Sequence, residues 1–286
     1  MESKHIKYKL MRTLVFTLLI MSAVSAAAPA GGVVFKVNGG RVISFEQMID
    51  EVKTSDIVFA GEIHGSEEHH KLQLAVIRAL HEADVPLAVG LEMFRQDSQH
   101  ELNRWVEGKM TEKQFVSLFY DNWRVAWPLY RPIFRYAREH SIPLVGLNVP
   151  GELSRKVSRK GFSSLTEKEK KALPPGITCD VDRTYMAFIK QAYSDHGVDE
   201  KYFINFCEAQ MVWDTSMAWH IIEYRRKNPG GVIVVLAGTG HAWKRGIPEQ
   251  VRRQSGLSFK VILPEIPSRV EKGKITTADA DYIFLP

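Results

Sequence analysis

Two glycine-rich turns and two glutamates bring together the residue types best suited to catalysis or metal binding. The segments GEIHG (Gly61–Gly65) and GTGH (Gly238–His241) each hold one histidine, and Glu62 and Glu92 supply two carboxylates. Imidazole and carboxylate groups serve in general acid–base catalysis and as ligands to divalent metal ions. The candidates for either role are Glu62, His64, Glu92 and His241. Residue type alone leaves both roles open.

Each of these residues lies at the end of a continuous apolar run. The runs cover residues 56–60, 86–91 and 231–237, and a further run at 143–147 precedes Asn148. Such runs, alternating with amphipathic segments, predict buried parallel strands covered by helices. The ligand crevice of such a sheet lies outside the carboxyl ends of its strands. We therefore predict an α/β fold, with a mostly parallel sheet covered by helices on both faces, and expect the four candidates to meet at one edge.

The segment between the runs at 143–147 and 231–237 contains no convincing strand. Residues 150–228 predict helices instead, the longest at about 201–227. That helix is apolar or aromatic around most of its circumference, which favours burial against the sheet. Some embedded residues are polar and need partners, which a pocket could provide: Glu208, Gln210, Asp214 and His220. We expect residues 29–286 to form a single α/β domain with a helical insertion at about 150–228.

Several common kinds of site are excluded because their motifs are missing. The sequence has no His-Glu-x-x-His helix of a zinc protease, no Gly-x-Ser-x-Gly elbow of a serine hydrolase and no Cys-x-x-Cys pair. The turn at Gly238–His241 lacks the third glycine of a dinucleotide-binding fingerprint. The two cysteines, Cys179 and Cys207, could form a disulfide or remain free thiols.

The first 28 residues have the pattern of an export signal. Basic residues precede the apolar run LVFTLLIM (14–21), and small residues follow as far as Ala28. The run is shorter than the roughly 20 residues that a membrane span needs. We therefore predict a signal peptide at 1–28 and a soluble, exported mature protein, periplasmic in a bacterium with two membranes. No cysteine lies near the expected cleavage site, so we expect no lipid anchor there.

The net charge of +5 does not indicate a nucleic-acid partner. Much of the basic excess lies within the predicted signal peptide, and the densest charged cluster, Glu167–Lys171, alternates in sign. A nucleic-acid-binding surface needs a stripe of one sign. We expect no nucleic acid among the partners.

Aromatic residues in the helical insertion offer another kind of ligand. Tyr185, Tyr202 and His196 lie there, and they could be surface residues or phenolate and imidazole ligands to an iron. Their spacing does not choose between these roles.

Four segments, in this order, resemble the ChaN family of haem-binding proteins in bacterial iron uptake. They are Gly61–Gly65, GLEMF (Gly90–Phe94), AQMVWDTSMA (Ala209–Ala218) and Gly238–His241 followed by GIP (Gly246–Pro248). The resemblance covers about residues 45–265. The family belongs to a wider group with the Tiki proteases and the erythromycin esterases.

The resemblance implies haem held between two protomers, with one tyrosine on each iron. Tyr185 or Tyr202 would bind the iron, and His196 and Lys244 would contact the propionates, with His64 and His241 as further cofactor-binding candidates. It also implies a homodimer that forms on haem binding and works with an outer-membrane haem receptor system.

Two functions follow as hypotheses. The first is an exported haem-binding protein for haem or iron uptake, trafficking or storage. The second is a metal-assisted or acid–base hydrolase of the Tiki or erythromycin-esterase type. It would use Glu62, His64, Glu92 and His241: the two histidines would hold a divalent metal or shuttle protons, and Glu92 would activate water.

Overall fold

A single eight-stranded sheet forms the centre of the computed structural model, which describes residues 32–177, 179–192 and 202–285. The strand order is β2-β1-β8-β7-β3-β6-β4-β5. All neighbours from β8 to β5 run parallel, whereas β1 pairs antiparallel with both β2 and β8. The strands are β1 (Val33–Lys36), β2 (Arg41–Ile43), β3 (Ile57–Glu62), β4 (Leu87–Arg95), β5 (Leu144–Asn148), β6 (Val232–Gly238), β7 (Phe259–Pro264) and β8 (Tyr282–Leu285).

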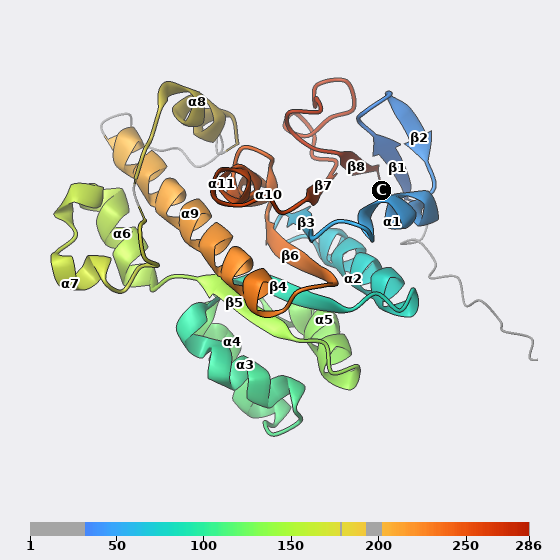
Figure 1. Ribbon diagram of the computed structural model, residues 1–286, viewed down its shortest axis with the longest axis horizontal. Coiled ribbons are helices and arrows are strands. Elements are labelled where there is room, and N and C mark those ends of the chain that lie inside the picture. The colour runs from blue at the N-terminus through green and yellow to red at the C-terminus, as the bar shows by residue number, and fades with distance from the viewer. Residues whose placement is uncertain (1–31, 178, 193–201, 286) are drawn as a thin grey trace, which may run out of the picture.

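Helices cover both faces of this sheet (Figure 1). One face packs against α1 (Phe45–Val52), α2 (Glu67–Glu82), α3 (Gln99–Val106), α4 (Glu112–Asn122) and α5 (Trp127–Glu139). The other packs against α8 (Arg183–Ala192), α9 (Phe203–Lys227), α10 (Thr239–Ala242) and α11 (Ile247–Gln254). The alternation of a strand explains this division, because Val58 contributes to the first core and Phe59 to the second. The predicted fold class is therefore confirmed.

Between β5 and β6 the described chain is helical. It holds α6 (Gly151–Lys160), the short α7 (Glu167–Lys170), α8 and the long α9, with a 3-10 turn at Phe162–Ser164. Leu153 and Val157 of α6 form a small core with Val212 of α9. Figure 1 shows α9 crossing in front of the sheet, with α6 and α7 beyond one of its sides. One side of α9 thus faces the sheet while another holds the outer helices.

The antiparallel strands β1 and β2 were not predicted. They are four and three residues long. Two of the four residues of β1 and one of the three residues of β2 are buried. A short edge strand carries too few buried positions to give a periodic signal. Pairing with β8 places β1 in the sheet.

Candidate functional site

A cavity of about 360 Å³ opens at the carboxyl-terminal side of the parallel strands. The ends of β3, β4, β5 and β6 contribute Glu62, Glu92, Asn148 and Gly238 to its wall. The four predicted acid–base residues all line it, so they do meet at one sheet edge. The complete lining is Glu62, Ile63, His64, Glu92, Trp123, Asn148, Ala192, Phe206, Gln210, Trp213, Gly238, Thr239, Gly240, His241 and Arg269.

Glu62, the last residue of β3, is a buried carboxylate with hydrogen bonds on Oε1 and an ion-pair contact on Oε2. The Tyr130 hydroxyl donates to its Oε1 at 2.5 Å, His64 Nδ1 lies 2.8 Å from the same oxygen, and His70 Nδ1 lies 3.0 Å from Oε2. Burial opposes ionisation, but the two histidines outweigh it and lower the pKa of Glu62 to about 2. Conversely, Glu62 raises the pKa of both histidines despite their burial. Glu62 is therefore an anion that orients its neighbours, and a poor base at neutral pH.

The start of α2 brings His70 to this carboxylate. Ser66 caps α2 by accepting a hydrogen bond from the His69 backbone N–H, so the chain turns back directly after His64. His70 Nε2 then lies 3.0 Å from the His64 carbonyl oxygen, while its Nδ1 faces Glu62. Gln73 lies one turn further on. Its Oε1 is 3.2 Å from His70 Nδ1, and its Nε2 donates a hydrogen bond to the Ala60 carbonyl oxygen. The imidazole of His70 is thus fixed by contacts on both ring nitrogens.

His241 is the centre of a second buried network. Its Nδ1 lies 2.6 Å from Asp214 Oδ1 on α9, and the Tyr185 hydroxyl donates to Asp214 Oδ2 at 2.7 Å. Its Nε2 lies 3.8 Å from Glu92 Oε1. Burial alone would lower the pKa of His241, but the carboxylates of Glu92 and Asp214 raise it to about 9. His241 is therefore a cation at neutral pH, with a proton on each ring nitrogen, and its Nε2 lies toward Glu92.

Glu92 joins the two networks through the end of β6. Its Oε2 accepts a hydrogen bond from the Gly238 backbone N–H at 2.6 Å. A Cβ atom at Gly238 would lie 2.8 Å from His64 Cε1, so glycine is what allows the imidazole to approach the strand. Thr239, the next residue, donates to the Glu62 carbonyl at 3.0 Å. The ends of β3, β4 and β6 are thus tied together by their functional residues.

Aromatic side chains form the outer walls of the cavity. The Trp123 ring stands edge-on to His64 at a centroid distance of 4.9 Å, and the Trp213 ring lies 5.7 Å from that of His241. Phe206 also lines the cavity, one and two turns before Gln210 and Trp213 on the same helix. The cavity therefore combines an ionised floor with apolar walls, and Arg269 adds a guanidinium group.

The proposed iron ligands differ in their surroundings. Tyr185 is 7% exposed and its hydroxyl is engaged by Asp214, whereas Tyr202, just before α9, is 44% exposed. Lys244 is bound elsewhere, to Asp281 Oδ1 and the Thr277 carbonyl, both at 2.9 Å. It does not line the cavity. His196 lies outside the described residues.

Among the residues that the sequence did not identify as part of the site are the partners of its charged groups, His70, Tyr130 and Asp214. His70 and Tyr130 lie in segments whose sequences indicate amphipathic helices and nothing more. Their contacts with Glu62 arise only when the chain folds. Asp214 gave a signal, because a carboxylate within an apolar helix must find a partner. Its partner, His241, could not be assigned without the fold.

Further features concern metals, thiols and membranes. Within residues 32–177, 179–192 and 202–285, no three His, Cys, Asp or Glu side chains are grouped so that they could hold a metal ion. Cys179 and Cys207 are free thiols in this structure. None of the helices in this described part of the chain has the length and apolar character needed to cross a membrane.

Comparison with solved structures identifies similar folds. The ChaN protein of Campylobacter jejuni, solved with cofacially bound haem, superimposes with a TM-score of 0.70 at 19% identity, covering 88% of this chain and 96% of that one. A mutant of the erythromycin esterase EreC in its open conformation gives a TM-score of 0.54 at 14% identity, covering 84% and 92%. Both likenesses concern the fold.

Sequence comparison extends these similarities. RETICULATA-RELATED 5, a chloroplastic protein of Arabidopsis thaliana, is 23% identical over an alignment of 239 residues that covers 77% of this chain. The matched part is 32% of the plant protein, so the chain spans about a third of the length of that relative. The family model described as haem-binding uptake, Tiki superfamily, ChaN matches residues 48–251, which include every strand that lines the cavity. The chain belongs to this ChaN-type haem-binding uptake family of the Tiki superfamily.

Proposed function

We propose that this protein binds haem at the mouth of the cavity, with Tyr202 as the iron ligand, in haem or iron uptake, trafficking or storage. One observation supports this choice most directly. Tyr202 is exposed immediately before α9 and precedes Phe206 by four residues, and Phe206, Gln210 and Trp213 all line the cavity. Because Tyr202 is the N-cap residue, one turn before Phe206, we expect its phenol on the side of α9 that faces the cavity.

The residues present fit a porphyrin in their chemistry. Trp123, Phe206 and Trp213 offer apolar ring faces, and Arg269 offers a positive charge for a propionate. A bound ferric haem would supply an iron centre for which a tyrosine phenolate is a known protein ligand. Tyr185 is the less suitable of the two tyrosines, because ligation would take its hydroxyl away from the buried Asp214.

The size of the cavity supports a shared cofactor. Cavities that enclose drug-sized ligands measure about 300–1,000 Å³. At about 360 Å³ this one is at the small end of that range, so a macrocycle would be only partly enclosed. We propose that a second copy of the chain covers the remainder, which would give the homodimer implied by the family resemblance. Exposed Ile63, beside His64 on the cavity wall, would lie near that contact.

Titration of the purified protein with haemin, followed by absorption spectroscopy, tests the iron ligand. We expect a shifted Soret band in the wild type, and loss of the tyrosinate spectrum with at least tenfold weaker binding in Tyr202→Phe. Tyr185→Phe should keep the spectrum. Tyr224→Phe, on the same helix near its other end, is the matched control. An unchanged spectrum in Tyr202→Phe would rule out the proposed ligation.

We further propose that residues 29–286 form one domain, with residues 150–228 as its helical insertion. We also propose that residues 1–28 direct export of the protein and are then removed. The basic start, the apolar run and the small residues of segment 1–28 support an exported location. The mass of the protein isolated from the periplasmic fraction of an expressing bacterium tests this. A mass that retains residues 1–28 would contradict it.

A second candidate function is supported by His241, which lines the cavity and is held by the buried Asp214. In the haem-free protein, Glu92 would accept a proton from a water molecule whose oxygen attacks an ester carbonyl. Protonated His241 would give its Nε2 proton to the departing alkoxide, and Asp214 would hold the ring in place. The fold shared with erythromycin esterase is consistent with this chemistry.

Hydrolysis assays on an ester library, with haem-free protein, test this second function. We expect His241→Asn and Glu92→Gln each to lower kcat/KM by about 10²- to 10⁴-fold, the usual contribution of general acid–base catalysis. His100→Asn, at an exposed histidine of α3, is the control. Turnover that is equal in all of these proteins would come from a contaminant and would contradict the assignment.

A further inference from the structure

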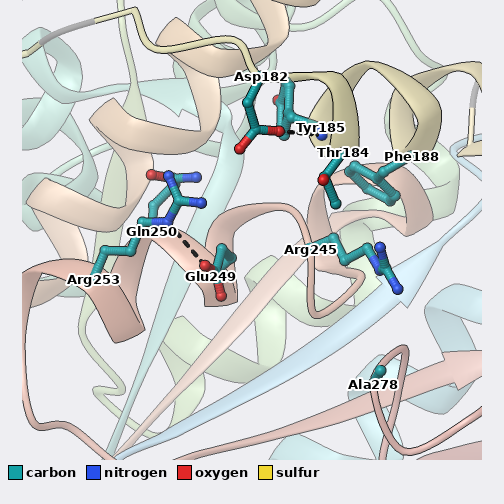
Figure 2. A pocket seen from close by; sticks show the side chains of 9 residues that line it. All are labelled: Asp182, Thr184, Tyr185, Phe188, Arg245, Glu249, Gln250, Arg253 and Ala278. Atoms are coloured by element: carbon teal, nitrogen blue, oxygen red, sulfur yellow. Dashed lines mark hydrogen bonds and ion pairs between the residues drawn. The ribbon is translucent and has the colours of Figure 1, made fainter.

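A second cavity lies behind the site, between α8, α11 and the segment around Ala278. Its volume is about 250 Å³, and it shares no lining residue with the first cavity. Figure 2 shows Gln250 and Arg253 of α11 opposite Asp182 and Tyr185 at the start of α8, with Phe188 and Arg245 to one side. Neither function proposed above uses this space.

The wall of this cavity carries hydrogen-bond donors that the described part of the chain leaves unused. Gln250 is 5% exposed, yet its amide nitrogen has no hydrogen-bond partner among the described residues. Arg245 makes one loose ion pair in the described chain, with its Nε 3.8 Å from Asp279 Oδ1. Arg253 donates a hydrogen bond from its Nε to Glu249 Oε1 at 2.8 Å. A buried amide without a partner is costly in a protein interior, unless a ligand completes its hydrogen bonds.

We propose that this second cavity binds a small organic carboxylate. The planar guanidinium of Arg245 can bind a carboxylate through two parallel hydrogen bonds, and the Gln250 amide adds a further polar contact. The Phe188 ring supplies an apolar surface for the body of the ligand. The small volume selects a compact molecule, below the size of most drug-like ligands.

The second cavity is connected to the first by two hydrogen bonds. Tyr185 lines the second cavity, and its hydroxyl donates to Asp214 Oδ2. Asp214 Oδ1 lies 2.6 Å from Nδ1 of His241, which lines the first cavity. A ligand that contacts Tyr185 therefore changes the surroundings of His241 without entering the main site. The second cavity would act as an effector site.

Nuclear magnetic resonance of the purified protein tests binding with three probes: acetate, benzoate and phenylacetate. We expect at least one probe to shift the backbone amide signals of Thr184 and Ala278, which lie on two sides of the cavity. Arg245→Gln and Gln250→Leu should each weaken that binding about tenfold, the equivalent of about 1.4 kcal/mol. Arg131→Gln, at an exposed arginine of α5 on the other face of the sheet, should leave it unchanged.

Three results would overturn the proposal. One is the absence of amide shifts with all three probes. Another is equal affinity for benzoate and uncharged benzamide, which would show that the cavity does not recognise the carboxylate group. The last is unchanged binding in Arg245→Gln, whose side chain is 46% exposed, so that the variant is expected to fold.

The connection between the cavities is tested by the ring signals of His241 in nuclear magnetic resonance. Bound probe should shift the ring signals of His241 in the wild type, and Tyr185→Phe should retain the probe but lose that shift. A His241 shift that persists in Tyr185→Phe would contradict the connection. These measurements need neither haem nor turnover, so failure of the proposed function would leave them interpretable.

Discussion

At the scale of single residues, Glu62 organises the site through its charge. Buried carboxylates are stable only when paired, and Glu62 has Tyr130, His64 and His70 as partners. Burial and the neighbouring carboxylate raise the pKa of Tyr130, so the phenol keeps its proton and remains a donor. The sequence identified Glu62 and His64 by their place after an apolar run. It could not identify His70 and Tyr130, because their contacts with Glu62 depend on how α2 and α5 pack.

Replacing Glu62 with glutamine tests its contribution to stability. Removal of one partner from a buried ion pair costs about 3 kcal/mol or more, because the remaining charges lose their counterion. We expect Glu62→Gln to lower the free energy of unfolding at pH 7 by about 3 kcal/mol, measured by urea denaturation. Glu139→Gln, at an exposed glutamate near the end of α5, is the control and should change it little.

The pH dependence of stability provides a second signature of Glu62. Its pKa is about 2 in the folded protein against an ordinary value of 4.5, so ionised Glu62 stabilises the fold above pH 4.5. That contribution is lost as the pH falls from 4.5 towards 2. We expect the free energy of unfolding of the wild type to fall more steeply over this interval than that of Glu62→Gln. Parallel curves for the two proteins would contradict the assigned pairing.

At the scale of secondary-structure elements, the ends of strands determine where the functional groups lie. The apolar runs of β3, β4, β5 and β6 were recognisable because every position of these parallel strands is buried or nearly so. Their register was not recognisable, since it depends on pairing between residues far apart in the chain. That register puts Glu62 opposite Gly238, and so places both networks at one edge.

The absence of a side chain at Gly238 is a requirement of this edge. We expect Gly238→Ala to push the His64 ring away from the strand end and to lower the free energy of unfolding by about 1–3 kcal/mol, the usual cost of overpacking. Histidine ring signals in nuclear magnetic resonance would report the displacement. Gly65→Ala is the matched control, because a Cβ atom there would meet no atom within 4 Å. Unchanged His64 signals in Gly238→Ala would show that the close approach has no effect.

At the scale of the whole molecule, the sheet separates two cores and leaves the cavity at their common edge. Helices α1 to α5 complete one core, and α8 to α11 complete the other. Alternating apolar runs and helices in the sequence were sufficient to predict this layered arrangement. Hydrophobic patterning reports which residues are buried, but it does not report which buried groups meet, so neither the order of the strands nor the second cavity could be predicted.

A change of oligomeric state should accompany haem binding. We expect the haem-free protein to elute as a monomer and the haem-saturated protein as a dimer in size-exclusion chromatography with light scattering. Ile63→Glu should prevent dimer formation, because the charge would be buried at the proposed contact. Val42→Glu, at an exposed valine of the edge strand β2, is the control. A haem-saturated wild type that remains monomeric would exclude the shared cofactor.

The pairing of β1 with β8 has a practical consequence for protein engineering. Val33 lies opposite Leu285, so the first and last strands of the described chain are neighbours in one sheet. A short linker could therefore join them, and the chain could be opened instead between Pro175 and Gly176, which are both exposed. A circular permutant of this design would keep both cavities intact while moving its ends beside α7. Fluorescent labels could then be attached at a site remote from β1 and β8.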